Sequence, residues 1–331
     1  MDRMQVFSRN EINQIHNASM EILTEIGLRF NSEETLDIFS RHGFKRDETK
    51  VFITEKQVQA ALETTPSRFK VRARNPAHDV VIGEESFVLL PTAGAPYVVT
   101  YPGERRVATL DDYHVCCRLV QTSNQLDMVG HKMVEPMDLD PQTAHLDMIF
   151  ASMVLCDKAY LGTAATREAT SDSIEMAAIA WGGKENLKRQ PVMAAIITAS
   201  SPLKYAAEES ESIIDMARLR QPVVITNLVM AGSSGPISLP GLLALANAEI
   251  LAGLVLSQLA GPGTPVVYGS ISAPADMRTV ISAVGAPEAV VLSSAIIQLA
   301  RFYHLPCRTG GMLTNAHVPD AQAAAEGVLM M

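Results

Sequence analysis

The chain repeats one pattern seven times: a short run of apolar, often β-branched residues, then small polar residues, then a helical segment. The runs are Ser86–Gly94, Leu126–Val134, Ala159–Thr166, Pro191–Pro202, Pro222–Gly232, Pro265–Pro274 and Leu305–Leu313. Alternation of strands and helices predicts a parallel sheet joined by crossover helices. The runs are apolar at successive positions, which is typical of strands covered by helices on both faces.

Two architectures have this alternation of strands and helices: a closed eight-fold barrel and an open doubly wound sheet. An open sheet of this kind usually carries a Gly-rich phosphate turn, and the sequence has neither a G-x-G-x-x-G nor a Walker-type motif. The seventh unit is followed by a helical run that reaches Met331. We therefore predict an α/β fold, a (β/α)8 barrel whose last strand is missing from this chain.

The first 75 residues differ from the rest and predict helices. Capping signals at Ser8, at Asn31 or Ser32, and at Thr54 each precede an amphipathic segment, and Gly43 and Pro66 mark two of the ends. The predicted division is a helical region over residues 1–75 and the incomplete barrel over residues 76–331. A hairpin turning at Pro102–Gly103 is predicted within the barrel.

Composition restricts the partners. The net charge of −9 argues against nucleic acid and anionic membranes, which favour basic surfaces. The N-terminus has no apolar signal core, and the polar residues within Leu239–Ala260 favour a buried helix over a membrane span. A cytoplasmic protein is predicted. The four cysteines lack zinc-type spacing and are predicted to be free thiols, with no bound metal.

Three of the predicted strands end in small, uncharged residues: ITASSP, VMAGSSGP and YGSISAP. In a barrel, chemistry occurs at the C-terminal ends of the strands. Small residues let backbone and hydroxyl groups come close to a bound molecule, although a tight loop explains one such segment equally well. Few charges stand at these ends, which disfavours a site that moves protons or holds a metal.

Longer blocks carry a family resemblance. PVVYGSISAPADMR (Pro265–Arg278), ASSPLKYAAE (Ala199–Glu208) and AVGAPEAVVLSSAIIQLARFYHLPCRTGGMLTNAHVPDAQA (Ala283–Ala323) resemble the trimethylamine methyltransferase (MttB-like) family. EIGLRFNSEETLDIFSRHGF and TPSRFKVRARNP extend the resemblance to nearly the whole chain. It implies a (β/α)8 barrel that moves a methyl group from a methylated amine to the cobalt of a separate corrinoid protein, with no cofactor bound directly. It also implies a longer protein, so a C-terminal truncation is expected.

The resemblance separates two branches. Family members that act on trimethylamine carry pyrrolysine in the loop that reads GGMLTNAHVPDAQ here, where Met312 or Leu313 stands at that position. The loss of this electrophilic residue implies the branch that resembles glycine betaine methyltransferase. A quaternary nitrogen is already a workable leaving group, whereas a tertiary amine must first be protonated or captured. The alternatives are a pyrrolysine-independent trimethylamine methyltransferase, a zinc-dependent corrinoid methyltransferase and a non-catalytic quaternary-ammonium-binding protein.

Candidate substrate residues were chosen at strand ends. Tyr97 and Tyr268 offer aromatic faces to a quaternary ammonium, although both also suit plain packing. Thr198 and Asn227 offer polar groups to substrate oxygens, or are satisfied by backbone. Arg308 matches the two oxygens of a carboxylate, or forms a salt bridge at the rim.

Three further predictions concern the rim of the barrel. His131 is a candidate carboxylate ligand, although a lone histidine is more often structural. Glu326 faces the ammonium, the cobalamin or solvent. Gly232, Ser233, Ser234 and Gly235 form a smooth loop predicted to face the corrinoid of the partner protein. A homo-oligomer is also predicted.

Overall fold

The computed structural model describes residues 4–91, 94–100 and 103–331. The chain forms two compact units. The first unit consists of Met1–Ser67, Ile197–Ile214 and Val224–Met331, and the second of Arg68–Ile196 and Asp215–Val223. Both units combine segments from distant parts of the chain, so they do not test the division predicted at residue 75. That division stays a prediction.

The first unit holds one half of the parallel sheet. β14 (Val266–Gly269) pairs in parallel with β16 (Cys307–Arg308), and β12 (Val223–Thr226) lies next to β14. β10 (Ala194–Thr198) ends in this unit, where Ala199 N–H donates to the C=O of Thr226 at 2.9 Å. The strands therefore follow one another in chain order, as crossover helices require.

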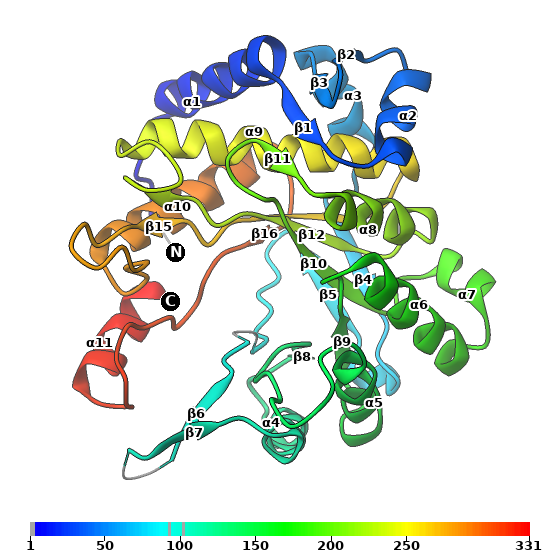
Figure 1. Cartoon of the computed structure of the whole chain (residues 1–331), viewed down its shortest axis with the longest axis vertical. Helices are drawn as coiled ribbons and strands as arrows, with labels where there is room; N and C mark the ends of the chain where they lie inside the picture. Colours follow the sequence, from blue (N-terminus) through cyan, green and yellow to red (C-terminus); the bar gives the residue numbers. More distant parts are fainter. Residues whose placement is uncertain (1–3, 92–93, 101–102) are drawn as a thin grey trace. The chain divides into compact units, whose positions relative to one another are not determined.

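The helix α9 (Leu239–Ala260) is the centre of the first unit. It is buried on all sides from Leu242 to Gln258, with α1 (Arg9–Glu21), α2 (Glu33–Arg41) and α3 (Glu55–Thr64) packed against it. Figure 1 shows α9 in yellow running beneath the blue α1. Its length and apolar composition would allow it to cross a membrane, but 83% of its most apolar window is buried in the protein. It is a core helix.

The three predicted N-terminal helices are confirmed, with some of their caps. Ser8 and Glu11 form a capping box, Ser32 accepts from Thr35 N–H, and Thr54 caps α3 with Gln57. The sequence analysis missed the short strands between these helices, β1 (Leu28–Phe30), β2 (Lys45–Asp47) and β3 (Lys50–Phe52), because each has only three residues. They form a sheet with β11 (Lys204–Tyr205) in the order β11-β1-β3-β2. The π-helical turn Ile22–Ile26 joins α1 to β1.

Further elements of the first unit follow the barrel strands. β13 (Met230–Ala231) pairs in parallel with β15 (Ala273–Pro274), directly beyond β12 and β14. The helices that follow are α10 (Pro287–Phe302) and α11 (Ala321–Met330). The helix α8 (Ala207–Arg218) connects β10 to β12. The small-residue segments after β12 and β14 therefore lie side by side, as predicted.

The second unit holds the other strands. β8 (Met128–Val129) and β9 (Ala159–Gly162) pair in parallel, and β9 pairs in parallel with the start of β10. The antiparallel hairpin of β4 (Arg68–Val71) and β5 (Val80–Gly83) packs against them. Its Val71 and Val80 share a buried cluster with Met128 and Leu161, among others. The hairpin thus covers one side of these strands.

The second unit is completed by helices and one more hairpin. The helices are α4 (Leu110–Thr122), α5 (Ala144–Leu155), α6 (Arg167–Trp181) and α7 (Lys184–Arg189), and a 3-10 turn spans Pro76–His78. β6 (Tyr97–Val99) and β7 (Arg105–Val107) form the predicted hairpin. Of its predicted turn, Gly103 is described and Pro102 lies outside the described residues.

Six of the seven predicted barrel strands are confirmed, and the first is not. The described part of Ser86–Gly94 contains no strand, and residues 92–93 lie outside the described residues. Leu89 still exchanges hydrogen bonds with Asp127, whose N–H donates to Leu89 C=O and whose carboxylate accepts from Leu89 N–H. The side chain of Asp127 replaces the backbone acceptor of a regular ladder, so the segment runs beside β8 without becoming a strand.

Candidate active site

The side chains of β12 and β14 alternate between the two faces of the sheet, and hydrogen bonds show which of these side chains point towards α9. The Tyr268 hydroxyl donates to Asn247 Oδ1 of α9 at 2.8 Å, and Asn227 Nδ2 donates to Glu249 Oε2 of α9 at 2.8 Å. Tyr268 and Asn227 therefore point towards α9. Their neighbours Gly269 and Thr226 point to the opposite face, because the side-chain period of a strand is two.

This opposite face carries a row of four residues, which we call the inner layer: Thr198, Thr226, Gly269 and Arg308. Gly269 and Arg308 are register partners in the parallel ladder. A Cβ on Gly269 would lie 3.0 Å from Thr226 Cβ, so those two positions also adjoin. The bond from Ala199 N–H to Thr226 C=O places Thr198 beside Thr226. All four residues belong to the first unit.

Arg308 is the only inner-layer residue with a formal charge. Its Nη1 is buried without a hydrogen-bond partner, and no carboxylate forms an ion pair with it among the described residues. Burial is the main cause of a lowered pKa of its guanidinium. Arg308 itself is half-buried, and a buried donor without a partner is unfavourable, so this position is suited to bind a carboxylate or a similar anion.

Thr226 and Gly269 complete the surroundings of Arg308. Thr226 is 1% exposed, and its Oγ1 has no partner among the described residues. Gly269 allows Thr226 to pack closely beside it, because a Cβ at this position would lie 3.1 Å from Thr226 Oγ1. Two unsatisfied polar groups thus flank a position without a side chain, which is the arrangement expected of a small polar subsite.

Two predicted substrate residues have structural partners instead. Tyr268 is fully buried and joins Asn247, which also donates to Tyr303 and Ser19. Asn227 is fully buried and donates to Ala246 C=O as well as to Glu249. Their predicted contact with substrate is corrected, because both side chains leave the strand on the helix side. The predicted Thr198 and Arg308 do lie on the inner face.

Glu249 of α9 holds several strand ends together. It is fully buried; its Oε2 accepts from Ser201 Oγ and Asn227 Nδ2, and its Oε1 accepts from Leu203 N–H, at 2.7 to 2.8 Å. Asn227 C=O in turn accepts from Ile271 N–H, which follows β14. One carboxylate therefore connects the segments after β10, β12 and β14. Burial is the main cause of its raised pKa.

The loop Gly232–Gly235 is small for reasons of packing. Gly232 has a φ of +84°, and a Cβ on Gly235 would lie 2.3 Å from Val229 Cγ1. Ser234 Oγ accepts from Met230 N–H, and Ser233 N–H donates to Met230 C=O. Each small residue thus has a local role in a tight turn. The predicted approach of a corrinoid to this loop stays a prediction.

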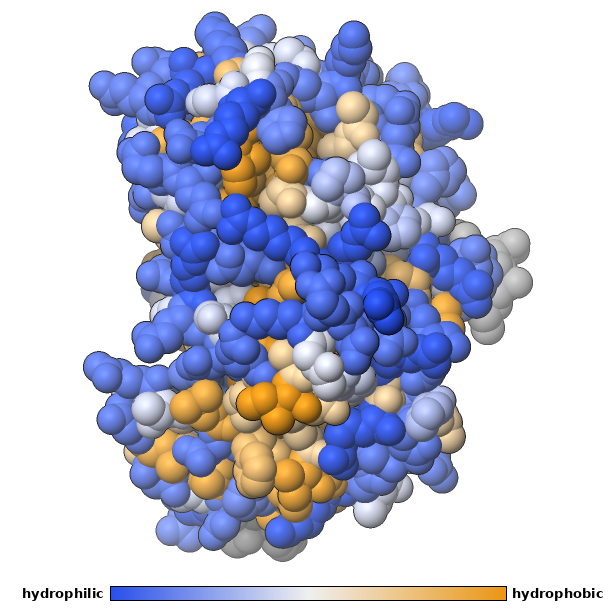
Figure 2. Space-filling model, turned by 90° about the vertical axis from the view of Figure 1, so that its right-hand side faces the viewer, coloured by the Kyte–Doolittle hydropathy of each residue, from blue (hydrophilic) through white to orange (hydrophobic). Residues whose placement is uncertain are grey.

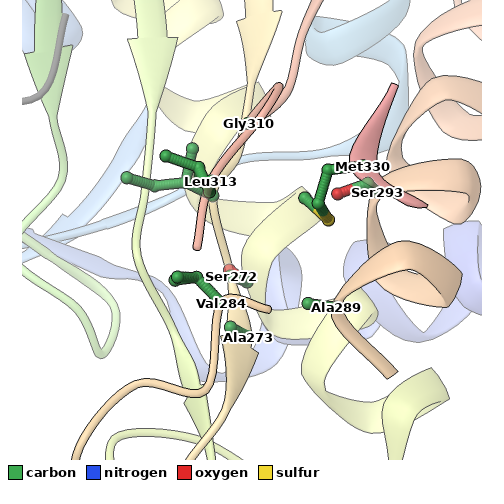
Figure 3. Close-up of a pocket in the computed structure, with 9 residues that line it drawn as sticks. Ser272, Ala273, Val284, Ala289, Ser293, Gly310, Leu313 and Met330 are labelled. Carbon is green, nitrogen blue, oxygen red and sulfur yellow. The ribbon is translucent and has the colours of Figure 1, made fainter. Parts of the chain in front are cut away.

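Glu326 accepts hydrogen bonds from the loop that contains Met312 and Leu313. Glu326 Oε2 accepts from Thr314 Oγ1 and from Asn315 N–H, and the bond from Thr314 is the main cause of its lowered pKa. Met312 has a φ of +53° and an exposed side chain, whereas Leu313 lines a crevice of about 10 Å³ together with Gly310 and Met330. Figure 3 shows this crevice, which is too small for a substrate.

Two predicted residues lie in the second unit. His131 is buried, neither ring nitrogen has a partner among the described residues, and burial lowers its pKa to about 3. It is therefore a neutral imidazole at physiological pH. Tyr97 is half-exposed in the hairpin β6–β7, and its ring is covered by the guanidinium of Arg105 at 3.8 Å. That ring face is already occupied by a cation.

Metal ligands are not gathered anywhere in the described part of the chain: no three His, Cys, Asp or Glu side chains there are placed to hold an ion. The four cysteines are free, as predicted. The inner-layer residues Thr226 and Gly269 were missed by the sequence analysis. Each directly neighbours a residue that was selected, and the burial of both faces of these strands left no signal in the sequence to separate the two positions.

Several known proteins are similar to this chain. The family model of trimethylamine methyltransferase (MTTB) matches residues 1–331. The chain belongs to the trimethylamine methyltransferase family. Glycine betaine methyltransferase of Desulfitobacterium hafniense (strain Y51) is 40% identical over all of this chain and 69% of that relative. Proline betaine:corrinoid methyltransferase of Eubacterium limosum is 34% identical over 98% of this chain and 68% of that relative.

Members named for trimethylamine are also similar. The trimethylamine methyltransferase MttB of Desulfitobacterium hafniense (strain DSM 10664 / DCB-2) is 33% identical over 98% of this chain and 66% of that relative. Among solved structures, the monomethylamine methyltransferase MtmB of Methanosarcina barkeri matches with a TM-score of 0.58 at 10% identity, over 91% of this chain and 61% of that one. This likeness confirms the predicted barrel-type fold. This chain spans about two thirds of the length of the relatives named above.

Proposed function

We propose that the protein transfers a methyl group from a quaternary amine with a carboxylate, such as glycine betaine, to the Co(I) of a cognate corrinoid protein. The half-buried Arg308, whose Nη1 is buried without a partner, is the observation that carries the choice of substrate, because it provides the counter-charge for a carboxylate. The similarity to glycine betaine and proline betaine methyltransferases supports the same class.

The residues of the inner layer would orient the substrate. Arg308 binds the carboxylate, Thr226 donates its free hydroxyl to one carboxylate oxygen, and Gly269 lets these two residues lie close together because it has no side chain. The ammonium then lies towards the strand ends, where Thr198 is exposed and where small residues leave the approach open. Tyr97 and His131 are retained as proposed substrate contacts that this arrangement does not require.

Methyl transfer needs little from the protein beyond this positioning. The electron pair of Co(I) forms the new cobalt–carbon bond, the carbon–nitrogen bond breaks, and its electron pair stays on nitrogen. A neutral tertiary amine leaves, so no proton has to be delivered in the step. This agrees with an inner layer that lacks a general acid, and alignment of the reacting atoms supplies the rate gain.

A methyl-transfer assay with several amines tests the proposal. The protein is mixed with a reduced cognate corrinoid protein and with glycine betaine, choline or trimethylamine, and formation of methylcobalamin is followed optically. Turnover of glycine betaine is expected. Turnover of trimethylamine alone would reject the substrate class, and tight binding of glycine betaine without turnover would indicate a binding protein.

The substitution Gly269→Ala tests whether the inner layer requires a residue without a side chain at this position. The new Cβ would lie 3.0 Å from Thr226 Cβ and 3.1 Å from Ile225 C=O, so its neighbours must shift. We expect kcat/KM for glycine betaine to fall by about 10- to 100-fold, because small displacements in a positioned site have effects of this order. Steady-state kinetics measure the change.

Gly253→Ala is the matched control for that substitution. Gly253 is an even more crowded glycine on α9, where a Cβ would meet the Tyr205 hydroxyl at 2.5 Å and Ile225 Cγ2 at 2.8 Å, away from the inner face. It is expected to lower the melting temperature without raising KM. Equal loss of kcat/KM in both variants would show that Gly269 acts only through stability.

A further inference from the structure

The second unit has a cluster of large apolar side chains on its surface. Val115 and Leu119 of α4, Phe150 and Val154 of α5, and Ile179 of α6 are each about half or more exposed, with Phe150 at 61% and Ile179 at 83%. The three helices pack against one another in the order α4-α5-α6. Figure 2 shows hydrophobic surface gathered in its lower part, where Figure 1 places α4 and α5. We call these five residues the apolar patch.

The composition of α5 is unusual for a helix with an exposed side. Its sequence AHLDMIFASMVL buries Met148, Ile149 and Ala151 inwards and still places Phe150 and Val154 outwards. Surface helices normally have a polar outer face, and a helix that is apolar all round is normally buried. The outer face of α5 therefore has the character of a covered surface.

Charged residues beside the patch are arranged for pairing with the same surface of another copy. Arg118 of α4 precedes Leu119, and Asp147 of α5 lies one helical turn before Phe150; both are exposed. Neither forms an ion pair among the described residues. In a twofold arrangement one surface meets itself, so two opposite charges that flank an apolar centre form two equivalent pairs.

We propose that the apolar patch is the interface between two copies of this chain, related by a twofold axis, with Arg118 of each copy facing Asp147 of the partner copy. The patch would be the apolar centre and the two charges would belong to the polar rim, as in protein interfaces generally. Apolar patches on monomeric proteins rarely exceed a few hundred Å², and five neighbouring large side chains reach about that limit.

Sedimentation analysis of the chain and of two matched variants tests the interface. The chain is expected to be a dimer whose mass falls on dilution. Val154→Asp places a charge in the centre of the patch and is expected to weaken association at least about 30-fold. Val328→Asp is the control, because Val328 is another exposed helical valine, on α11 of the first unit, and it is expected to leave association unchanged. Circular dichroism checks that both variants fold.

A charge exchange separates the twofold arrangement from other associations. Arg118→Asp and Asp147→Arg are each expected to weaken the dimer about three- to tenfold, since rim pairs contribute modestly, and the double variant is expected to restore it. A monomeric parent chain would overturn the proposal. So would a dimer that Val154→Asp leaves intact, or a double variant no tighter than the single ones.

Discussion

Replacement of Arg308 with methionine is expected to lower kcat/KM for glycine betaine by roughly 30- to 1000-fold, which corresponds to about 2–4 kcal/mol. The substrate carboxylate would enter a buried position without its counter-charge, and a buried polar group that loses its partner is penalised heavily. Arg308→Lys is expected to recover only part of the activity, because an ammonium cannot bind both carboxylate oxygens in the planar fork of a guanidinium.

The choice of substrate makes this prediction specific. Choline lacks a carboxylate, so its turnover, however slow, is expected to stay the same in Arg308→Met. The control Arg301→Met removes an exposed arginine from the last turn of α10 and is expected to leave both substrates unaffected. If Arg308→Met reduced choline and glycine betaine turnover equally, Arg308 would have a structural role and the carboxylate subsite would be abandoned.

The largest effect on stability is expected for Glu249→Ala. The change leaves the part-buried Leu203 N–H and Ser201 Oγ without this acceptor, and it removes one of the two acceptors of the buried Asn227 Nδ2. Each buried group without a partner costs about 1–3 kcal/mol, so a total of about 3–5 kcal/mol is expected after partial relaxation. At roughly 2–4 °C per kcal/mol, the melting temperature should fall by about 6–20 °C. Thermal unfolding followed by circular dichroism measures it.

The pH dependence of stability provides a second readout for Glu249. Its pKa is raised in the folded protein, chiefly by burial. The folded state therefore holds the proton more tightly than the unfolded state, so this group lowers stability as pH rises through the window above the unfolded value of 4.5. Glu249→Gln is expected to remove this contribution, so the free energy of unfolding should depend less steeply on pH in that window. An unchanged slope would show that the carboxylate titrates normally.

The prediction of elements succeeded where the local signal was long and periodic. The three N-terminal helices were predicted from their caps, and the apolar segment Leu239–Ala260 was predicted to be the buried helix that is observed as α9. The strand predicted at Ser86–Gly94 is not formed. This apolar segment lies beside β8, but Leu89 N–H donates to the side chain of Asp127 and not to a backbone carbonyl of a neighbouring strand. The three-residue strands β1 to β3 were missed because pairing partners, not propensity, define them.

The structure shows on which face of the strands the predicted site residues lie. Arg308 and Thr198 were selected at strand ends and do lie on the inner face. Asn227 and Tyr268 were selected by the same rule and point to α9, because a change of one position along a strand exchanges its two faces. Runs such as VVYG are apolar on both faces, so the sequence contains no alternation from which the orientation of Tyr268 could be read.

By itself, the sequence determined the class of fold, the family and the types of side chain at the strand ends. These depend on local periodicity and on long matching blocks, both of which are properties of the linear chain. Only the tertiary structure decided which residues face inwards, that Glu249 connects three strand ends, and that Arg308 has no counter-charge among the described residues. Those facts depend on register and on burial, and both arise only when segments far apart in the chain come together.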